Sequence, residues 1–281
     1  MGVFRYVVCD VFTDRALSGN QLAVFTDARK IPEGDLQGLA REMAYSETVF
    51  VYPANGDAHV RLRIFTPEAE LPFAGHPVLG SAFVLGGPLQ AETVRFETGV
   101  GVIPVRLERE GPRIVFGRMT QPVPTWEPFA HTDELLAALG VDRSELPVEV
   151  YDNGLKYVYV VLSSVEDVAR LQPDLRRLGA LPEVLGANCL AGSGRTWKTR
   201  MFAPADGVPE DPATGSAAGP LAVHLLRHGL VGSGEEVEIS QGAELNRPST
   251  LYARAWGTPE EIERVEVGGS AVVVARGEFR L

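Results

Sequence analysis

Two stretches of the chain predict helices that are apolar on nearly every face. They are AGHPVLGSAFVLGG at residues 74–87 and ATGSAAGPLAVHLL at residues 213–226. Each starts with a turn that contains glycine and continues with small and apolar side chains, and a helix of that kind cannot lie on a surface. Both helices are therefore predicted to be buried. Pro77 is expected at the first position of the first helix, where its missing N–H would have no partner anyway.

Strand-like segments surround the first of these helices. Runs rich in valine and phenylalanine precede and follow it: FRYVVCDVF, NQLAVF, ETVFVYP, HVRLRIFTP, TVRFETGVGVIPVRLERE and RIVFGRM. One segment between them has apolar residues at helical spacing, at Leu36, Leu39, Ala40 and Met43. The first part of the chain is thus predicted to be a sheet with one buried and one amphipathic helix.

The same order recurs after a proline-rich segment, TQPVPTWEPFAHT, which is the predicted linker. Beyond it the pattern predicts a short helix in DELLAALG, a strand in LKYVYVVL, and one or two surface helices in SSVEDVARLQPDLRRLGAL. A strand in RTWKTRMFAP leads into the second buried helix. Strands in EVEISQGAEL, STLYARAW and SAVVVARGEF then close the chain.

Three landmarks of the first half return in the second half, in the same order and at offsets of 133, 140 and 143 residues. The pairs are Asn20 with Asn153, Gly75 with Gly215, and Gly99 with Gly242. A period this long indicates a duplicated domain, since solenoid repeats are far shorter. We expect one domain at residues 1–120 and a second at 121–281, with a C-terminal strand at about 271–281 returning to the first.

Length and charge agree with this organisation and narrow the class of partner. At 281 residues the chain suits two domains of roughly 150 residues each. A net charge of −11 without any cluster of Lys and Arg argues against a nucleic-acid surface, so a small molecule is the expected partner. No apolar run reaches the ~18 residues of a membrane span, and no signal peptide is evident, which predicts a cytoplasmic protein. Cys9 and Cys189 form no CxxC pair and are expected to be buried free thiols.

The two helix N-termini are candidate anion sites. The first N–H groups of a helix have no internal partner, and the helix dipole adds partial positive charge there. If the duplication brings the two ends together, N–H groups near Gly75, His76, Gly215 and Ser216 could hold a small carboxylic acid. The alternative is that the two glycines only satisfy turn geometry and that Ser216 caps its helix.

Three titratable residues near these turns are candidates for acid–base chemistry. Glu47 stands where an amphipathic helix ends and an apolar strand begins, and burial there would raise its pKa toward neutrality, as a proton carrier requires. Asp211 precedes Pro212 in an extended turn, and His76 can donate, accept or carry a proton. The alternatives are a solvent-facing glutamate, an ordinary Asp–Pro turn and a histidine that is merely hydrogen-bonded.

Other chemistries find little support in the sequence. His224 and His228 lie four residues apart, but the HExxH pattern fails and no third ligand is evident, so no metal is expected. The segment GVGVIP lacks the third glycine of a dinucleotide fingerprint. Neither a GxSxG elbow nor a P-loop occurs.

Five segments together resemble the PhzF family of phenazine-biosynthesis-like proteins, over essentially the whole chain. They are DVFTDRALSGNQLAVF, SETVFV, FTPEAELPFAGHPVLGSA, RMFAPADGVPEDPATGSAAGPL and QGAELNRPS. The resemblance implies the α+β, diaminopimelate-epimerase-like fold, in which two pseudo-symmetric domains each wrap a curved mixed sheet around a central helix, with the site in the cleft between them. It also implies isomerase chemistry without a cofactor, and a homodimer.

By the same resemblance, the catalytic glutamate of the family falls on Glu47, and its substrate-binding residues fall on Asn20, Gly75, His76, Asp211, Gly215 and Ser216. The related racemases that use two cysteines carry one at the N-terminus of each buried helix, which we call the helix mouth. Here the two mouths read AGHP and ATGS, which excludes that mechanism. The chain departs from the family at Gln21, often proline, and at Asn246, usually glycine. Both departures concern the shape of loops.

We therefore expect an enzyme that moves a proton within a small amino- or hydroxy-substituted carboxylic acid. Glu47 would take the proton from one carbon and return it to another, while Asp211 and His76 would hold the polar substituents. The alternative is a protein that binds a small carboxylate without turning it over. The presence of Glu47 favours the enzyme, because a protein that only binds needs no desolvated base.

Overall fold

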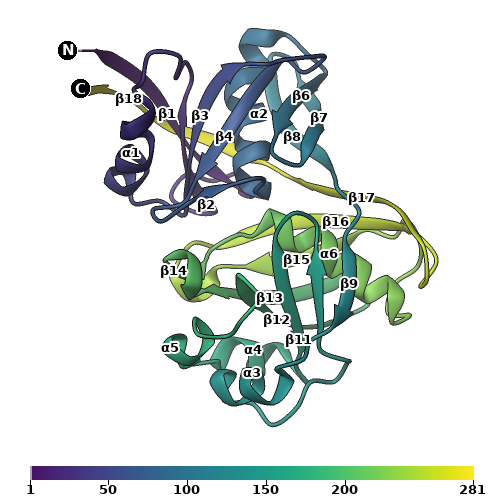
Figure 1. The fold of residues 1–281 in the computed structure, drawn as a ribbon. Helices are drawn as coiled ribbons and strands as arrows, with labels where there is room; N and C mark the ends of the chain where they lie inside the picture. Colours follow the sequence, from purple (N-terminus) through teal and green to yellow (C-terminus); the bar gives the residue numbers. More distant parts are fainter. Residues whose placement is uncertain (1) are drawn as a thin grey trace. The chain divides into compact units, whose positions relative to one another are not determined.

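The computed structural model describes residues 2–281, apart from the side chain of Asp206. The chain divides into two compact units (Figure 1). Unit 1 comprises Met1–Thr120 together with Gly268–Leu281, and unit 2 comprises Gln121–Val267. Within unit 1 the chain ends pair, because Gly2 N donates to Leu281 O at 2.6 Å.

The described part of unit 1 contains two α-helices, and nearly half of the unit lies in strands. The helices are α1 (Leu36–Met43), preceded by the 3-10 turn η1 (Glu33–Asp35), and α2 (Gly75–Leu89). The strands are β1 (Val3–Val11), β2 (Asn20–Phe25), β3 (Glu47–Pro53), β4 (Val60–Phe65), β5 (Glu70–Leu71), β6 (Thr93–Thr98), β7 (Gly101–Glu110), β8 (Arg113–Gln121) and β18 (Ala271–Arg280).

Unit 2 repeats this composition with more helical segments. Its helices are α3 (Thr132–Leu139), α4 (Val165–Arg170), α5 (Leu175–Leu178) and α6 (Gly215–Arg227), with 3-10 turns η2 (Pro204–Asp206) and η3 (Ala243–Leu245). Its strands are β9 (Thr125–Pro128), β10 (Glu149–Asp152), β11 (Lys156–Val161), β12 (Gly186–Ser193), β13 (Thr196–Ala203), β14 (Val208–Asp211), β15 (Val237–Gln241), β16 (Ser249–Gly257) and β17 (Ile262–Gly269).

The two units share one order of strand pairing. In unit 1, β18, β1 and β2 are antiparallel neighbours, β2 runs parallel to β3, β3 antiparallel to β4, and β4 pairs antiparallel with β5 and parallel with β6. In unit 2, β9, β10 and β11 are antiparallel, β11 runs parallel to β12, β12 antiparallel to β13, and β13 pairs antiparallel with β14 and parallel with β15. The next pair is antiparallel in both, β6 with β7 and β15 with β16. This correspondence is a strong sign of duplication.

Each unit encloses one apolar helix, as the sequence predicts. Helix α2 is buried from Gly75 through Ala82 and contacts β1, β2, β3, β6, β7 and β18 (Figure 1). Helix α6 is buried from Gly215 through Leu226 and contacts β16. Small residues allow this close packing: a Cβ on Gly80 would lie 2.6 Å from the side chain of Leu22.

Several expectations about the surrounding elements need correction. The predicted linker contains β9, which pairs with β10. Strands β10, β12 and β17 were not expected. In β12 the sequence GANCLAGS has none of the β-branched or aromatic residues that mark strands. The prediction of one or two helices at 163–181 is confirmed, since α4 and α5 form there and Ser164 caps α4 by accepting from Asp167 N. Over residues 2–281, no helix has the length and apolar character needed to span a membrane.

Candidate active site

A cluster of polar side chains in unit 1 lies at the N-terminus of α2. The cap residue Ala74 is extended, at φ −155° and ψ 143°, and no side chain caps the helix among the described residues. The helix begins at Gly75, so Pro77 is its third residue and the expected first position is wrong. The physical argument for it still holds, since every position of the first turn lacks an intrahelical acceptor for its N–H.

His76 connects the helix to two other predicted site residues. Its Nδ1 lies 3.2 Å from Nδ2 of Asn20, the first residue of β2, and its Nε2 lies 3.4 Å from Oε2 of Glu47, the first residue of β3. The side chain of Glu47 is 15% exposed and that of His76 is 3% exposed. Three residues that are widely separated in the sequence therefore meet in one buried polar group.

The His76 ring is neutral over the physiological pH range. Burial lowers its pKa from 6.5 to about 3, and a hydrogen bond with the backbone of Gln21 offsets this only in part. A neutral imidazole carries one N–H and one acceptor nitrogen. Glu47 thus lies beside an imidazole ring that is uncharged near pH 7.

The N-terminus of α6 in unit 2 is built on a different set of contacts. Asp211 ends β14, and its Oδ2 accepts from Thr214 Oγ1 at 2.6 Å. Gln241, at the end of β15, donates to Asp211 O at 2.8 Å and to Thr214 Oγ1 at 3.0 Å, and accepts from Thr214 N at 3.1 Å. These buried bonds fix the turn from Asp211 to the helix.

Gln241 and Thr214 are residues that the sequence reasoning missed. Gln241 directly precedes Gly242, one of the duplicated landmarks, and Thr214 directly precedes Gly215. Polar residues next to two landmark glycines were the signal that could have identified them. Their partner Ser249 Oγ closes the same turn by donating to Pro212 O at 2.9 Å.

Gly215 and Ser216 begin α6, and Ser216 does not cap it. The cap position is Thr214, without a side-chain cap bond among the described residues, so the suggested capping role of Ser216 is wrong. Ser216 Oγ lies 3.3 Å from the hydroxyl of Tyr157. Its carbonyl accepts from Asn153 Nδ2 at 2.9 Å, which supplies the bond that Pro220, lacking an N–H, cannot give.

The remaining landmarks lie beside these two helix mouths. A Cβ on Gly99 would approach Cα of Pro72 to 2.7 Å, and a Cβ on Gly242 would approach O of Pro212 to 2.5 Å. Gly242 also has φ +78°, where a side chain would be strained. Each glycine thus lets a strand end pass close to the proline-containing turn that leads into its helix. Asn246 has φ +55°, which explains why glycine suits this position and why asparagine is tolerated.

His224 of α6 and His228, the C-cap of that helix, do have a third polar partner, contrary to expectation. Glu149 on β10 places Oε2 3.0 Å from His228 Nε2 and 3.3 Å from His224 Nδ1, a spacing that could hold a metal ion. The same oxygen accepts from Arg227 Nη1 at 2.7 Å and from the Tyr151 hydroxyl at 2.9 Å. We interpret the group as an ion-pair hub, because Arg227 already neutralises the carboxylate that a cation would need.

In this hub, burial and hydrogen bonds have opposing effects on the pKa values of Glu149 and of His224. Burial alone would raise the pKa of Glu149, but hydrogen bonds from His224, Arg227, His228 and Tyr151 outweigh it and hold the pKa well below its usual range. Burial lowers the pKa of His224, against the pull of Glu149. Glu149 is therefore ionised and His224 neutral near pH 7.

The predicted site residues thus fall into two groups, one in each unit. Unit 1 brings together Asn20, Glu47, Gly75 and His76, and unit 2 brings together Asp211, Gly215 and Ser216. The cysteines lie elsewhere. Cys9 and Cys189 are buried free thiols, as expected, and burial raises the pKa of both.

Comparison with known proteins gives one consistent picture. The sequence profile of the phenazine biosynthesis-like protein family matches residues 9–277. A trans-2,3-dihydro-3-hydroxyanthranilate isomerase from Pseudomonas aeruginosa is 50% identical over 277 residues, which cover 99% of this chain and 99% of that protein. A protein of the same name from Pseudomonas fluorescens is 47% identical with the same coverage.

Solved structures agree with these sequence relatives. A predicted epimerase from Pseudomonas aeruginosa has a TM-score of 0.82 at 32% identity and covers 98% of this chain and 99% of its own. A phenazine biosynthesis protein of the PhzF family from Bacillus anthracis has a TM-score of 0.87 over 100% of both chains, at 22% identity, which bears on the fold alone. The α+β, epimerase-like fold expected from the sequence is confirmed.

Proposed function

Because the chain belongs to the PhzF family of phenazine biosynthesis-like proteins and is an isomerase, we propose that it isomerises trans-2,3-dihydro-3-hydroxyanthranilate. The name of that compound describes a six-membered ring acid with an amino group and a hydroxyl group. It matches the class of small amino- and hydroxy-substituted carboxylic acids that the sequence favours.

Glu47 is the proposed proton carrier. Its carboxylate would take a proton from one ring carbon, the electrons of that C–H bond would shift through the adjacent double bonds, and the proton would return to another carbon. Atoms and oxidation state are unchanged overall, so no redox cofactor is needed. The observation that carries the proposal is the buried contact of Glu47 with the neutral ring of His76. That contact places an uncharged ring next to the carboxylate.

The residues of unit 2 are proposed to bind the substituents of the substrate. Asp211 would accept from its amino or hydroxyl group, and the uncapped N–H groups of Gly215 and Ser216 would donate to its carboxylate. In unit 1, the N–H of Gly75 would donate in the same way, and Asn20 would fix the position of the His76 ring. The raised pKa expected for Glu47 and the homodimer implied by the resemblance stay predictions.

Replacement of Glu47 by glutamine tests the proposal directly. Glu47→Gln keeps the volume and one acceptor oxygen but cannot exchange a proton, so kcat should fall by at least the ~10²-fold typical of losing a general acid–base group. Ligand affinity should change little. In heavy water, wild-type enzyme should place deuterium at the receiving carbon whenever Glu47 exchanges with solvent between its two steps.

A matched control separates this effect from a general loss of glutamate charge. Glu42 is exposed on α1, and Glu42→Gln should leave kcat unchanged. Turnover of trans-2,3-dihydro-3-hydroxyanthranilate by the wild-type enzyme must be verified first. Retention of full turnover by Glu47→Gln would move the proton transfer to Asp211 or His76.

A further inference from the structure

An arginine–glutamate pair recurs at the same place in both units, next to each helix mouth. In unit 1, Arg63 on β4 donates from Nε and Nη2 to Glu70 Oε1 and Oε2, at 2.7 and 2.6 Å. In unit 2, Arg200 on β13 donates from the same two nitrogens to Glu210 Oε1 and Oε2, at 2.8 and 2.7 Å. Both glutamates stand five residues before the first residue of the buried helix. We call these pairs clamp 1 (Arg63–Glu70) and clamp 2 (Arg200–Glu210).

The rest of each arginine is also held in the same manner. The guanidinium of Arg63 lies over the ring of Phe65 at 5.2 Å, and that of Arg200 lies over the ring of Phe202 at 4.9 Å. In each unit, the residue after the arginine pairs with the residue after the glutamate. Ile64 pairs with Leu71, and Met201 pairs with Asp211. The clamps are therefore duplicated parts of the scaffold.

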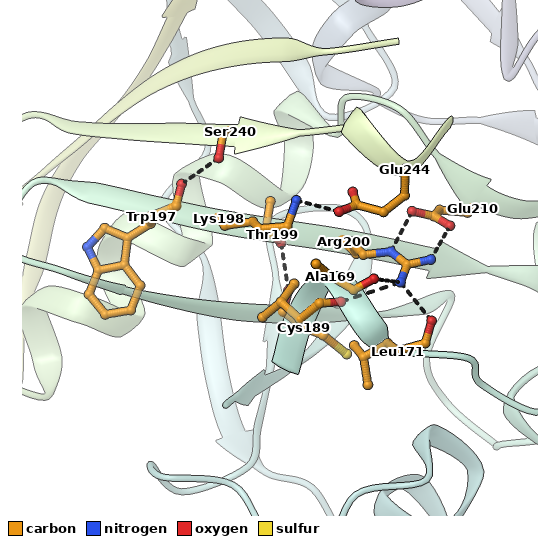
Figure 2. A network of polar contacts seen from close by, with 11 residues as sticks. Ala169, Leu171, Cys189, Trp197, Lys198, Thr199, Arg200, Glu210, Ser240 and Glu244 are labelled. Atoms are coloured by element: carbon orange, nitrogen blue, oxygen red, sulfur yellow. Dashed lines mark hydrogen bonds and ion pairs between the residues drawn. The ribbon is translucent and has the colours of Figure 1, made fainter. Parts of the chain in front are cut away.

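The two clamps differ in burial and in their third contact. The side chains of Arg200 and Glu210 are 9% and 12% exposed, against 17% and 41% for Arg63 and Glu70. Arg63 Nη1 donates to a largely exposed Glu33. Arg200 Nη1 instead donates to carbonyls at the end of α4, to Leu171 O at 2.7 Å and Ala169 O at 3.2 Å (Figure 2).

The strand that clamp 2 holds has little backbone pairing of its own. Only two residue pairs join β14 to β13, Met201 with Asp211 and Ala203 with Val208, and the register shifts between them. Neighbouring side chains on a strand point to opposite faces. Glu210 is tied toward α4 on one face, while Asp211 reaches Thr214 at the mouth of α6 on the other.

From this geometry we infer that Arg200 is a positioning residue: clamp 2 fixes β14 and thereby the place at which Asp211 meets the substrate. The inference rests on the proposed role of Asp211 in binding. A buried ion pair is weak evidence for stability, because apolar replacements often fold as well. What a bidentate arginine adds is direction, and lysine cannot reproduce it.

The test compares apolar and conservative replacements of both clamps. The double variant Arg200→Met with Glu210→Met removes the directional hydrogen bonds between the two side chains and keeps their bulk. The variant Arg200→Lys keeps the positive charge without the bidentate geometry. Both variants should raise KM about tenfold, in line with a displaced hydrogen bond to a charged group, while kcat changes less than threefold. A role in stability alone would reduce the folded fraction, which lowers apparent kcat and leaves KM unchanged.

Clamp 1 supplies the matched control. Arg63→Met with Glu70→Met alters the same geometry at the exposed copy, where such pairs contribute little, and the next residue is Leu71 in place of Asp211. This double variant should leave KM within twofold of wild type. An equal rise of KM in both double variants, or no rise in either clamp 2 variant, would overturn the inference.

Hydrogen exchange separates this inference from the proposed function. Peptides spanning residues 208–214 should exchange faster in the clamp 2 variants, whichever substrate the enzyme uses. Unchanged exchange there refutes the clamp itself, whereas failure of wild-type enzyme to convert the named substrate refutes only the proposed reaction. If the double methionine variant does not fold, Glu210→Gln, which keeps the shape and one acceptor, gives the same readouts.

Discussion

The two helix mouths share a scaffold and differ in their chemistry. In unit 1, His76 lies at the mouth of α2, and its neutral ring contacts Glu47. In unit 2 the mouth of α6 faces an aspartate locked by Thr214 and Gln241. The first arrangement leaves a group able to carry a proton, and the second holds an acceptor in a fixed place. We interpret this as a division of labour between exchange and binding.

Strand register shows where the difference arises. Glu47 is the first residue of β3, opposite Leu22 of β2, whereas the first residue of β12, opposite Tyr157 of β11, is Gly186. The second unit thus has no carboxylate at the corresponding place. The strand order, the landmark glycines and the arginine clamps are common to both units, and the proposed difference in chemistry lies in a few side chains at the mouths.

The two buried helices are also held differently. Contacts of α2 with its sheet come from an almost wholly apolar sequence. The carbonyls of the first turn of α6 accept from the side chains of Gln121, Asn153 and Tyr159, at 2.8, 2.9 and 2.8 Å. Near its other end, α6 is bound through the Glu149 hub. Side chains also reach α2, where Asn20 contacts His76 and Arg109 donates to Gly86 O at 3.0 Å, but three such bonds hold the first turn of α6.

The largest expected effect comes from removing the charge of Glu149, one of the polar groups that hold α6. Glu149→Gln leaves Arg227 without its ionised partner in a buried place, and loss of one partner of a buried pair costs about 3–5 kcal/mol. We expect the free energy of unfolding of unit 2 to fall by that amount in urea titration or calorimetry. A loss below about 1 kcal/mol would show that the hub is no stronger than a surface pair.

Controls for this prediction lie in the same unit. Glu145 forms an exposed pair with Arg143, so Glu145→Gln should change stability by less than about 1 kcal/mol. A chelator should change neither stability nor activity, because Arg227 already occupies the oxygen that a metal would use. Activity lost to a chelator and restored by zinc would contradict this interpretation.

The next effect tests the division of labour between the mouths. Asp211→Asn removes the charge that strengthens a hydrogen bond to the substrate, typically about 1.5–3 kcal/mol, so KM should rise at least about tenfold. Since the proposed proton carrier is Glu47, kcat should fall less than about threefold, opposite to the pattern expected for Glu47→Gln. Asp142→Asn, on the exposed surface of unit 2, serves as the control. A fall in kcat that exceeds the rise in KM would place Asp211 in the chemistry.

The sequence predicted the scaffold better than the details of the mouths. The buried helices followed from apolar periodicity, and the duplication from Asn20, Gly75 and Gly99, because these features are local or rest on steric necessity. The contact of Glu47 with His76 could not be read from periodicity, since it depends on how β3 is placed beside α2. Glu149 was missed as a partner of His224 for the same reason: it lies on β10, a strand of four residues, and its contact with α6 depends on how that strand is placed.

A smaller effect follows from the buried neutral ring in unit 1. The pKa of His76 is about 3 when folded and near 6.5 when unfolded, so between these values the unfolded chain binds a proton that the folded protein does not. Stability therefore rises with pH in this window, and lowering the pH from 6.5 to 5.5 should cost about 1 kcal/mol. His76→Gln should flatten the slope by that amount in pH-dependent unfolding, while His224 contributes equally to both proteins. An unchanged slope would mean that His76 is protonated in the folded state.

The smallest effect asks which helix mouth binds the carboxylate. Benzoate should stabilise the protein by about 0.4 kcal/mol when its concentration equals its Kd, measured as a rise in melting temperature that continues with the logarithm of the benzoate concentration. Benzamide has the same shape without the charge and should give no such rise. If the anion binds at α6, Asp211→Asn should tighten benzoate binding, because a nearby negative charge is removed; if it binds at α2, the affinity should not change. Equal shifts with benzoate and benzamide would show that neither uncapped helix selects an anion.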